Sequence, residues 1–283
     1  MFYIRQIWEM QKAPPPGRWF RDPAYMSIML AELTVTVAFM VFYFWIRGIR
    51  PDDVDQSVAR SLHLIRFEQQ VGLFQEVRWQ EAFIGHATIM SAANQIYAWG
   101  HYPVMLATAI WLFFFKGPTR FRFARNVVAI SAILGIASYY LLPTAPPRLM
   151  AAHGYDFGFV DTVFGAASDV DYFQPEPFVN DYAALPSFHF GWMALSAAVL
   201  WVNTRRLLVR ALAVIMPVVM WWAVTVTGNH YFFDMVFGGV VVAAAWLVVA
   251  AFARAPLPRA FAALVGEPSA AFAEARARQG EGA

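Results

Sequence analysis

The chain has 283 residues, of which 59% are hydrophobic and 14% charged, and its formal net charge is +2. Soluble domains contain roughly 45–50% apolar and about 25% charged residues, so an apolar excess spread over the whole chain predicts a polytopic membrane protein. The small net charge, without a basic patch interleaved with aromatic residues, argues against a nucleic-acid partner. The absence of cysteine excludes disulfides, thiolate chemistry and Cys-based metal sites.

The predicted membrane-spanning helices follow from long apolar segments. Residues 1–25 contain no apolar stretch that ends at a small-residue cleavage site, so we expect no cleavable signal peptide and a cytoplasmic N-terminal segment. A helix needs about 20 mostly apolar residues to cross a bilayer core of roughly 30 Å. Segments of this kind lie at 26–46, 96–115, 125–142, 186–203, 207–226 and 230–253. They predict six spans.

The connections between these spans differ in character. Residues 47–95 are too polar to cross, but LHLIRFEQQVGLF and WQEAFIGHATIMSAA carry apolar residues at helical spacing, which predicts two interfacial amphipathic helices. Residues 143–185 form a long extracytoplasmic loop, whereas the short connection NTRRL makes spans four and five an antiparallel hairpin. We therefore expect an all-α membrane domain over 26–253 and a cytoplasmic tail over 254–283.

The distribution of basic residues predicts the orientation. If the N-terminus is cytoplasmic, most of the 21 Lys and Arg residues lie on the cytoplasmic side, as the positive-inside rule requires. The far side then holds Arg47, Arg50, Arg60, Arg66, Arg78 and Arg148. The protein is thus expected in the cell membrane, with both termini on the cytoplasmic side and an even number of spans between them.

This topology brings three polar stretches to the same membrane depth, on the periplasmic or exterior side. They are PTAPPRL after span three, ALPSFHFGW at the start of span four, and TGNHYFFD between spans five and six. They deliver Arg148, His189, His230 and Asp234 to one surface. Ionisable groups in and near the membrane are costly and are usually functional, so this co-location predicts a reaction site.

The residue types predict covalent catalysis on histidine. His230 and Asp234 are four positions apart and share a helix face, so the carboxylate can orient the imidazole as a nucleophile. His189 can protonate a leaving oxygen as a general acid. Alternative interpretations are a structural His–Asp pair and a Ser-x-His helix cap.

An anionic group suits the remaining residues. Arg148 can bind phosphate bidentately, although a snorkelling interfacial arginine is the alternative. Ser187, Asn229 and the free N–H groups at the N-termini of spans four and six favour a bound anion. His189, His230 and Asp234 also offer three zinc ligands, but the neighbouring cation favours an anion. We therefore expect phosphoryl transfer without a metal or other cofactor.

At PSFH and GNHYFFD the chain resembles the type 2 phosphatidic acid phosphatase superfamily, which also contains vanadium haloperoxidases. The resemblance implies that His230 is the nucleophile, Asp234 its partner and His189 the acid, with Arg148 of PTAPPR in place of the first-motif arginine. Two positions depart from the family pattern. Val224 and Leu141 stand where the superfamily motifs carry an Arg and a Lys.

These departures, together with PTAPPR and TGNHY, look more like the inositol phosphorylceramide synthase branch, and the resemblance covers roughly residues 60 to 250. FEQQVGLFQE and the N-x-x-Y stretch also resemble its N-terminal half. A possible acceptor pocket then comprises Glu68, Asn94, Tyr97 and His101, for which helix–helix hydrogen bonding is the alternative.

The branch resemblance implies transfer of a phospho-head group, such as inositol phosphate, from a lipid donor to an alcohol acceptor. The alternative is hydrolysis by water of a lipid phosphate, such as a polyprenyl phosphate or diphosphate, or phosphatidate. A membrane transporter is a remote alternative, because transporters place their polar groups near the bilayer midplane. A scaffold would need no paired histidines at one depth.

Overall fold

The computed structural model describes residues 23–49, 53–165, 168, 170 and 178–253. The expected cytoplasmic segments at the two ends fall almost wholly outside this part of the chain. The chain divides into two compact units, 1–246 and 247–283, and the packing described below is that of the first. The long elements are α2 (Pro23–Gly48), α3 (Val54–Gln70), α4 (Glu76–Ile84), α5 (Ala87–Gln95), α6 (His101–Trp111), α7 (Pro118–Leu141), α8 (Phe188–Asn203), α9 (Leu207–Val226) and α10 (Phe232–Phe252).

The all-α class is confirmed, and five helical segments in the described chain are long and apolar enough to cross a membrane. They are Met26–Gly48, Ala87–Lys116, Thr119–Leu141, Leu207–Val226 and Phe232–Phe252. The fourth predicted span differs, because α8 has only 16 residues. At 1.5 Å per residue it is about 24 Å long, shorter than the hydrocarbon core. It begins after Ser187 and ends before Thr204, whose backbone is extended.

The insert between the first two spans also differs from the sequence prediction. The first amphipathic segment lies in α3 and its following turn, as expected, but the second is broken at Gly85 and His86 into α4 and α5. α5 continues through a π-helical turn, Ile96–Gly100, into α6, and a second such turn, Leu112–Lys116, ends the span. The second expected interfacial helix is therefore divided: its C-terminal half, α5, forms the first turns of the Ala87–Lys116 span.

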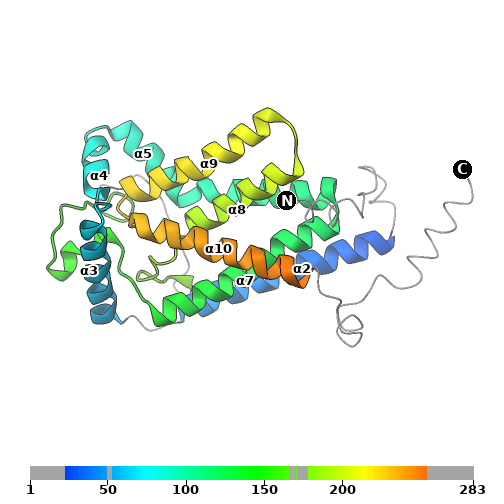
Figure 1. Ribbon diagram of the computed structural model, residues 1–283, viewed down its shortest axis with the longest axis horizontal. Helices are drawn as coiled ribbons and strands as arrows, with labels where there is room; N and C mark the ends of the chain where they lie inside the picture. Colours follow the sequence, from blue (N-terminus) through cyan, green and yellow to red (C-terminus); the bar gives the residue numbers. More distant parts are fainter. Residues whose placement is uncertain (1–22, 50–52, 166–167, 169, 171–177, 254–283) are drawn as a thin grey trace, which may run out of the picture. The chain divides into compact units, whose positions relative to one another are not determined.

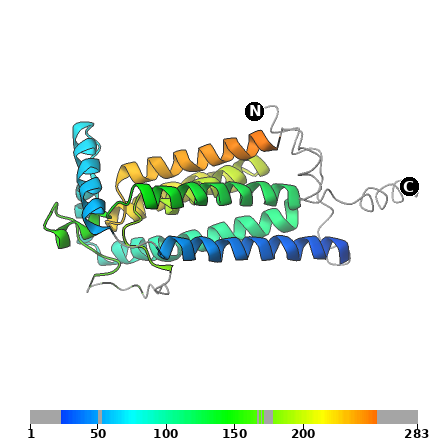
Figure 2. The ribbon, with the colours of Figure 1, turned by 90° about the horizontal axis from the view of Figure 1, so that it is seen from below.

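The long helices lie side by side, and α3 runs across the end at which α10 begins (Figures 1 and 2). α8 packs along α9 and α6, α2 along α7, and α4 along α9. The short connection between α8 and α9 thus makes the predicted antiparallel hairpin (Figure 1). A buried cluster that includes Met193, Met220, Val224 and Met235 joins α8, α9 and α10.

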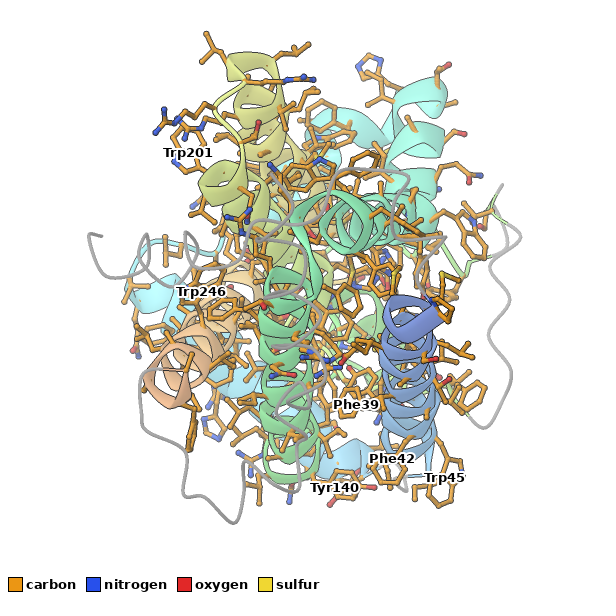
Figure 3. The ribbon with its side chains drawn as sticks, turned by 90° about the vertical axis from the view of Figure 1, so that its right-hand side faces the viewer. Phe39, Phe42, Trp45, Tyr140, Trp201 and Trp246 are labelled. Atoms are coloured by element: carbon orange, nitrogen blue, oxygen red, sulfur yellow. The ribbon has the colours of Figure 1, made fainter. Side chains whose placement is uncertain are left out.

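Aromatic side chains project from the outer surfaces of the long helices. Phe42 and Trp45 of α2 point away from the neighbouring helices and are about half exposed (Figure 3). Such apolar surface is tolerated where lipid replaces water. Inside, Glu32 of α2 accepts from Arg122 at 2.5 Å and from Arg125, both on α7. These two arginines neutralise the buried carboxylate of Glu32 in the first span.

Candidate active site

The histidine and aspartate at the start of α10 lie against each other. Nδ1 of His230 is 3.3 Å from Oδ2 of Asp234, and the same oxygen accepts from the backbone N–H of Tyr231 at 2.9 Å. Asp234 is fully buried and His230 is 5% exposed. A proton on Nδ1 directed to the carboxylate leaves the lone pair on Nε2. The arrangement is therefore that of an oriented imidazole nucleophile.

His189 lies beside this pair, within a cluster of rings. Its ring centroid is 5.7 Å from that of His230, and 4.6 Å from those of Tyr97 and His101. His189 is at the first turn of α8, whereas Tyr97 and His101 come from the Ala87–Lys116 span. His101 is buried, and its ring interacts with the backbone of Tyr97 one turn earlier. The two imidazoles that the sequence predicted to meet are thus brought together, and a third joins them.

Arg148 lies in a short 3-10 turn, Pro147–Leu149, and contacts the residues just before α10. Its backbone N–H donates to the carbonyl of Gly228 at 2.8 Å, and its Nε donates to Oδ1 of Asn229 at 3.0 Å. Gly228 adopts φ +70°, a conformation that glycine tolerates. The loop from α7 is therefore fixed directly to the loop that carries His230.

The guanidinium of Arg148 is also paired with carboxylates. Its Nη1 donates to Asp161 at 3.0 Å, and its Nη2 is 3.7 Å from Asp181. The side chain is 7% exposed, and its Cζ lies 4.2 Å from the ring centroid of Phe164. Arg148 is thus held on several sides rather than extended toward an interface, which disfavours the snorkelling interpretation.

These groups line a common cavity of about 550 Å³. Its polar end includes Arg148, Asn229, His230, His189, Tyr97 and His101. From there the wall continues along α7 between Tyr139 and Phe121, which is about 27 Å of helix. Along this length it is mostly apolar, with Met40, Leu106, Leu112, Leu195 and Val199 among the lining residues. A polar end joined to a long apolar chamber suits an amphiphilic ligand.

The N-termini of α8 and α10 near the cavity differ from each other, and that of α10 differs from the sequence expectation. The first two amides of α10 are occupied, because Phe232 N–H donates to Glu76 and Phe233 N–H donates to Glu68, both at 2.7 Å. The expectation that α10 offers free N–H groups to an anion is therefore wrong. α8 has no side-chain cap, since Ser187 Oγ makes no such bond.

Ser187, Glu68 and Asn94 do not line the cavity. Ser187 is fully buried, and its N–H donates to the carbonyl of Asp234 at 3.0 Å. Asn94 exchanges two hydrogen bonds with Thr162, at 2.8 and 2.9 Å. Glu68 and Asn94 thus make contacts between elements, outside the cavity. Tyr97 and His101 do line the cavity.

Sequence reasoning missed two charged residues of the site. Arg47, at the end of α2, lines the cavity and interacts electrostatically with Tyr97, His101 and His189. Its carbonyl accepts from Asn180 at 2.9 Å, one residue before the Asp181 that pairs with Arg148. Asp161 is the other. In the sequence, Arg47 is indistinguishable from an ordinary residue at the end of a span, and Asp161 lies in a loop without a motif.

Comparison with known protein families bears on this site. The model of the PAP2 superfamily matches residues 62–249, which is most of the chain and includes both histidine motifs. The chain belongs to the PAP2 superfamily. Enzymes of this superfamily are generally phosphatases or phosphotransferases that act on lipid phosphates. No curated protein and no solved structure matches the chain significantly.

Among the described residues of this PAP2 protein, no group of three or more His, Cys, Asp and Glu side chains could hold a metal ion. His189, His230 and Asp234, the three ligands considered from the sequence, therefore do not form such a site. Arg148 and Arg47 line the same cavity as His189 and His230.

Proposed function

We propose that this protein is a metal-independent lipid phosphotransferase that works through a phosphohistidine-type intermediate on His230. The observation that carries this proposal is the common cavity. One end holds an Asp-oriented imidazole, a second imidazole and an arginine, and the rest is lined mostly by apolar side chains along α7.

The proposed reaction has two steps. Nε2 of His230 attacks the phosphorus of the donor, the bond to the leaving oxygen breaks, and His189 gives that oxygen a proton. The acceptor hydroxyl then loses its proton to His189 and attacks the phosphorus, which releases His230. Asp234 holds the imidazole in the attacking tautomer and stabilises the positive charge that develops on it.

We assign phosphate binding to Arg148, which Asn229 orients, and to the N-terminus of α8, which has no side-chain cap. Arg47 is the second cation of the proposed site. It lies on α2, outside the sequence motifs, and compensates for the apolar Val224 and Leu141. Val224 is fully buried in the core between helices, where a charge would be costly.

Of the two possible reactions, we favour transfer of a phospho-head group to an alcohol. It rests on the resemblance to the inositol phosphorylceramide synthase branch, and Tyr97 and His101 beside His189 are the candidate residues that contact the acceptor. Hydrolysis of a polyprenyl phosphate or diphosphate, or of phosphatidate, uses the same catalytic residues with water as the acceptor. Superfamily membership covers both reactions.

The site is proposed to face the periplasm or cell exterior, with both termini cytoplasmic. The distribution of Lys and Arg supports this orientation. Because the chain has no cysteine, single cysteines placed in the 204–206 connection and at Tyr155 test it cleanly. An impermeant reagent added outside intact cells should label the second and spare the first.

The function is tested on purified protein in detergent, with His230→Ala and His86→Ala as variant and matched control, since His86 is exposed and outside the site. Labelled lipid donors are offered with and without alcohol acceptors, including inositol and diacylglycerol, and the lipid products are separated. A new lipid that requires both acceptor and His230 supports transfer. Free phosphate or head group regardless of acceptor supports hydrolysis. Turnover that survives in His230→Ala, or that a chelator abolishes, contradicts the mechanism.

A further inference from the structure

Three carboxyl groups converge on the beginning of α10, outside the catalytic cavity. Asp234 accepts from the N–H of Tyr231 at 2.9 Å, Glu76 from that of Phe232 and Glu68 from that of Phe233, both at 2.7 Å. Three successive backbone donors are thereby satisfied. Negative groups also complement the positive end of a helix dipole.

Glu68 and Glu76 reach this position from different helices. Glu68 is near the end of α3, and Glu76 is the first residue of α4. Both are fully buried. Each uses Oε1 for its bond to α10, while Oε2 is buried and accepts no bond from any donor in the described chain. Two ionised carboxylates buried together, each with one oxygen that no donor reaches, would be strongly destabilising.

A shared proton resolves this arrangement. The side chains of Glu68 and Glu76 interact with each other, and two ionised carboxylates have no hydrogen to place between them. When Glu68 is protonated it donates to Glu76, and both Oε1 atoms still accept from α10. The proton on Oε2 of Glu68 is then donated to Oε2 of Glu76, so that both of these atoms take part in a hydrogen bond.

We infer that Glu68 and Glu76 form an acid–carboxylate pair that clamps the first turn of α10 and thereby positions His230 and Asp234 for catalysis. They are positioning residues, because neither lines the cavity. The inference rests on the proposed function for its catalytic part. The clamp also explains why two glutamates of the polar insert are buried beneath a predicted membrane span.

The electrostatic surroundings support the shared proton. Burial, followed by the bond to Glu76, raises the pKa of Glu68 from its ordinary value of 4.5 to about 9. Burial likewise raises the pKa of Glu76. The other titratable groups that face the pair are Asp234 and Tyr231, and the pKa of the Tyr231 hydroxyl is raised by burial and then by Asp234. Within the described chain, the charged groups that act on Glu68 and Glu76 are carboxylates, so a second negative charge on the pair would be uncompensated.

The sign of the pH dependence follows from these values. The folded protein binds the Glu68 proton more tightly than the unfolded chain does, so this contribution to stability is complete below about pH 4.5 and is lost as the pH rises to about 9. Above about pH 9 the pair becomes two adjacent carboxylates. Their repulsion loosens the first turn of α10, and turnover should fall.

The test compares Glu68→Gln, Glu68→Ala and the control Glu81→Gln, which makes the same change on the exposed face of α4. A glutamine keeps the oxygen that accepts from Phe233 and supplies a permanent donor to Glu76. We therefore expect Glu68→Gln to keep turnover within about twofold at pH 7 and to lose the alkaline decline of the wild type. Glu68→Ala should lower kcat by about 10- to 100-fold with little change in KM, since a displacement of about 1 Å costs that much.

An infrared spectrum tests the pair without catalysis. At pH 7 the wild type and Glu81→Gln should show the carbonyl band of a buried protonated carboxylic acid, and Glu68→Gln should lack it. The same band in all three proteins, or an alkaline decline that persists unchanged in Glu68→Gln, overturns the inference. If the wild type turns over no lipid phosphate, the proposed function fails, and the infrared result still decides whether the pair holds a proton.

Discussion

In the proposed catalytic pair, His230 and Asp234, one oxygen of the carboxylate makes two contacts and the other makes none among the described residues. Asp234 uses one oxygen for both His230 and the N–H of Tyr231, and its other oxygen is buried without a partner in the described chain. Backbone and ring are therefore held by one carboxylate oxygen. This geometry couples the direction of the imidazole to the backbone of the first turn of α10. A neutral replacement of Asp234 should therefore change the tautomer of His230 more than the fold.

Replacement of Asp234 by Asn should accordingly lower kcat by about 10²- to 10⁴-fold, because the amide no longer fixes the proton on Nδ1 of His230. The amide oxygen can still accept from Tyr231 N–H, so the melting temperature should change little. Steady-state kinetics and thermal unfolding in detergent provide the comparison, with Asp156→Asn in an exposed turn as the control. A kcat equal to that of the wild type would show that Asp234 does not orient the nucleophile.

At the scale of helices, the distance between the two histidines depends on a close contact of α8 with α10. A Cβ atom on Gly238 would lie 2.3 Å from the carbonyl oxygen of Ser187, and one on Gly191 would lie 3.0 Å from that of Gly238. Small residues at such positions let helix backbones approach closely in membranes. The contact sets the first turn of α8, with His189, against the first turn of α10.

Gly238→Ala should push these two helices apart. We expect a loss of about 1–3 kcal/mol in stability, as overpacking of a tight contact typically costs, and a fall in kcat because His189 moves from His230. Gly239→Ala is the matched control. Its Cβ would lie 3.4 Å from Phe190, an ordinary contact, and alanine is favoured over glycine in a helix. Equal behaviour of the two variants in thermal unfolding and turnover would refute this role of the α8–α10 contact.

At the scale of the whole molecule, the features predicted correctly from sequence are those encoded locally. The apolar segments identify helices because hydropathy is summed over about 20 residues, and the His230–Asp234 pair follows from a four-residue spacing on one helix. The meeting of His189 with His230 followed from the shared membrane depth of their motifs. The length of α8 and the break between α4 and α5 were missed, since the termini of these helices depend on local turns that a hydropathy window does not resolve.

The residues whose contacts could not be predicted from the sequence act between distant parts of the chain. Glu76 and Glu68 bind amides that are 156 and 165 positions away. Arg47 lines the cavity from the first described helix, whereas the first motif, PTAPPR, begins at residue 143. No periodicity or spacing in the sequence encodes such pairings, which arise only when the insert folds across the end of the bundle.

The most direct test of the account is detection of the covalent intermediate. Purified protein is mixed with a donor that carries a radioactive phosphorus and quenched in base within one turnover, beside His230→Ala. The account predicts protein-bound label that survives base, is released by acid, and disappears when the acceptor is added, with none in the variant. Label in His230→Ala, or turnover by the wild type without label on His230, would contradict it.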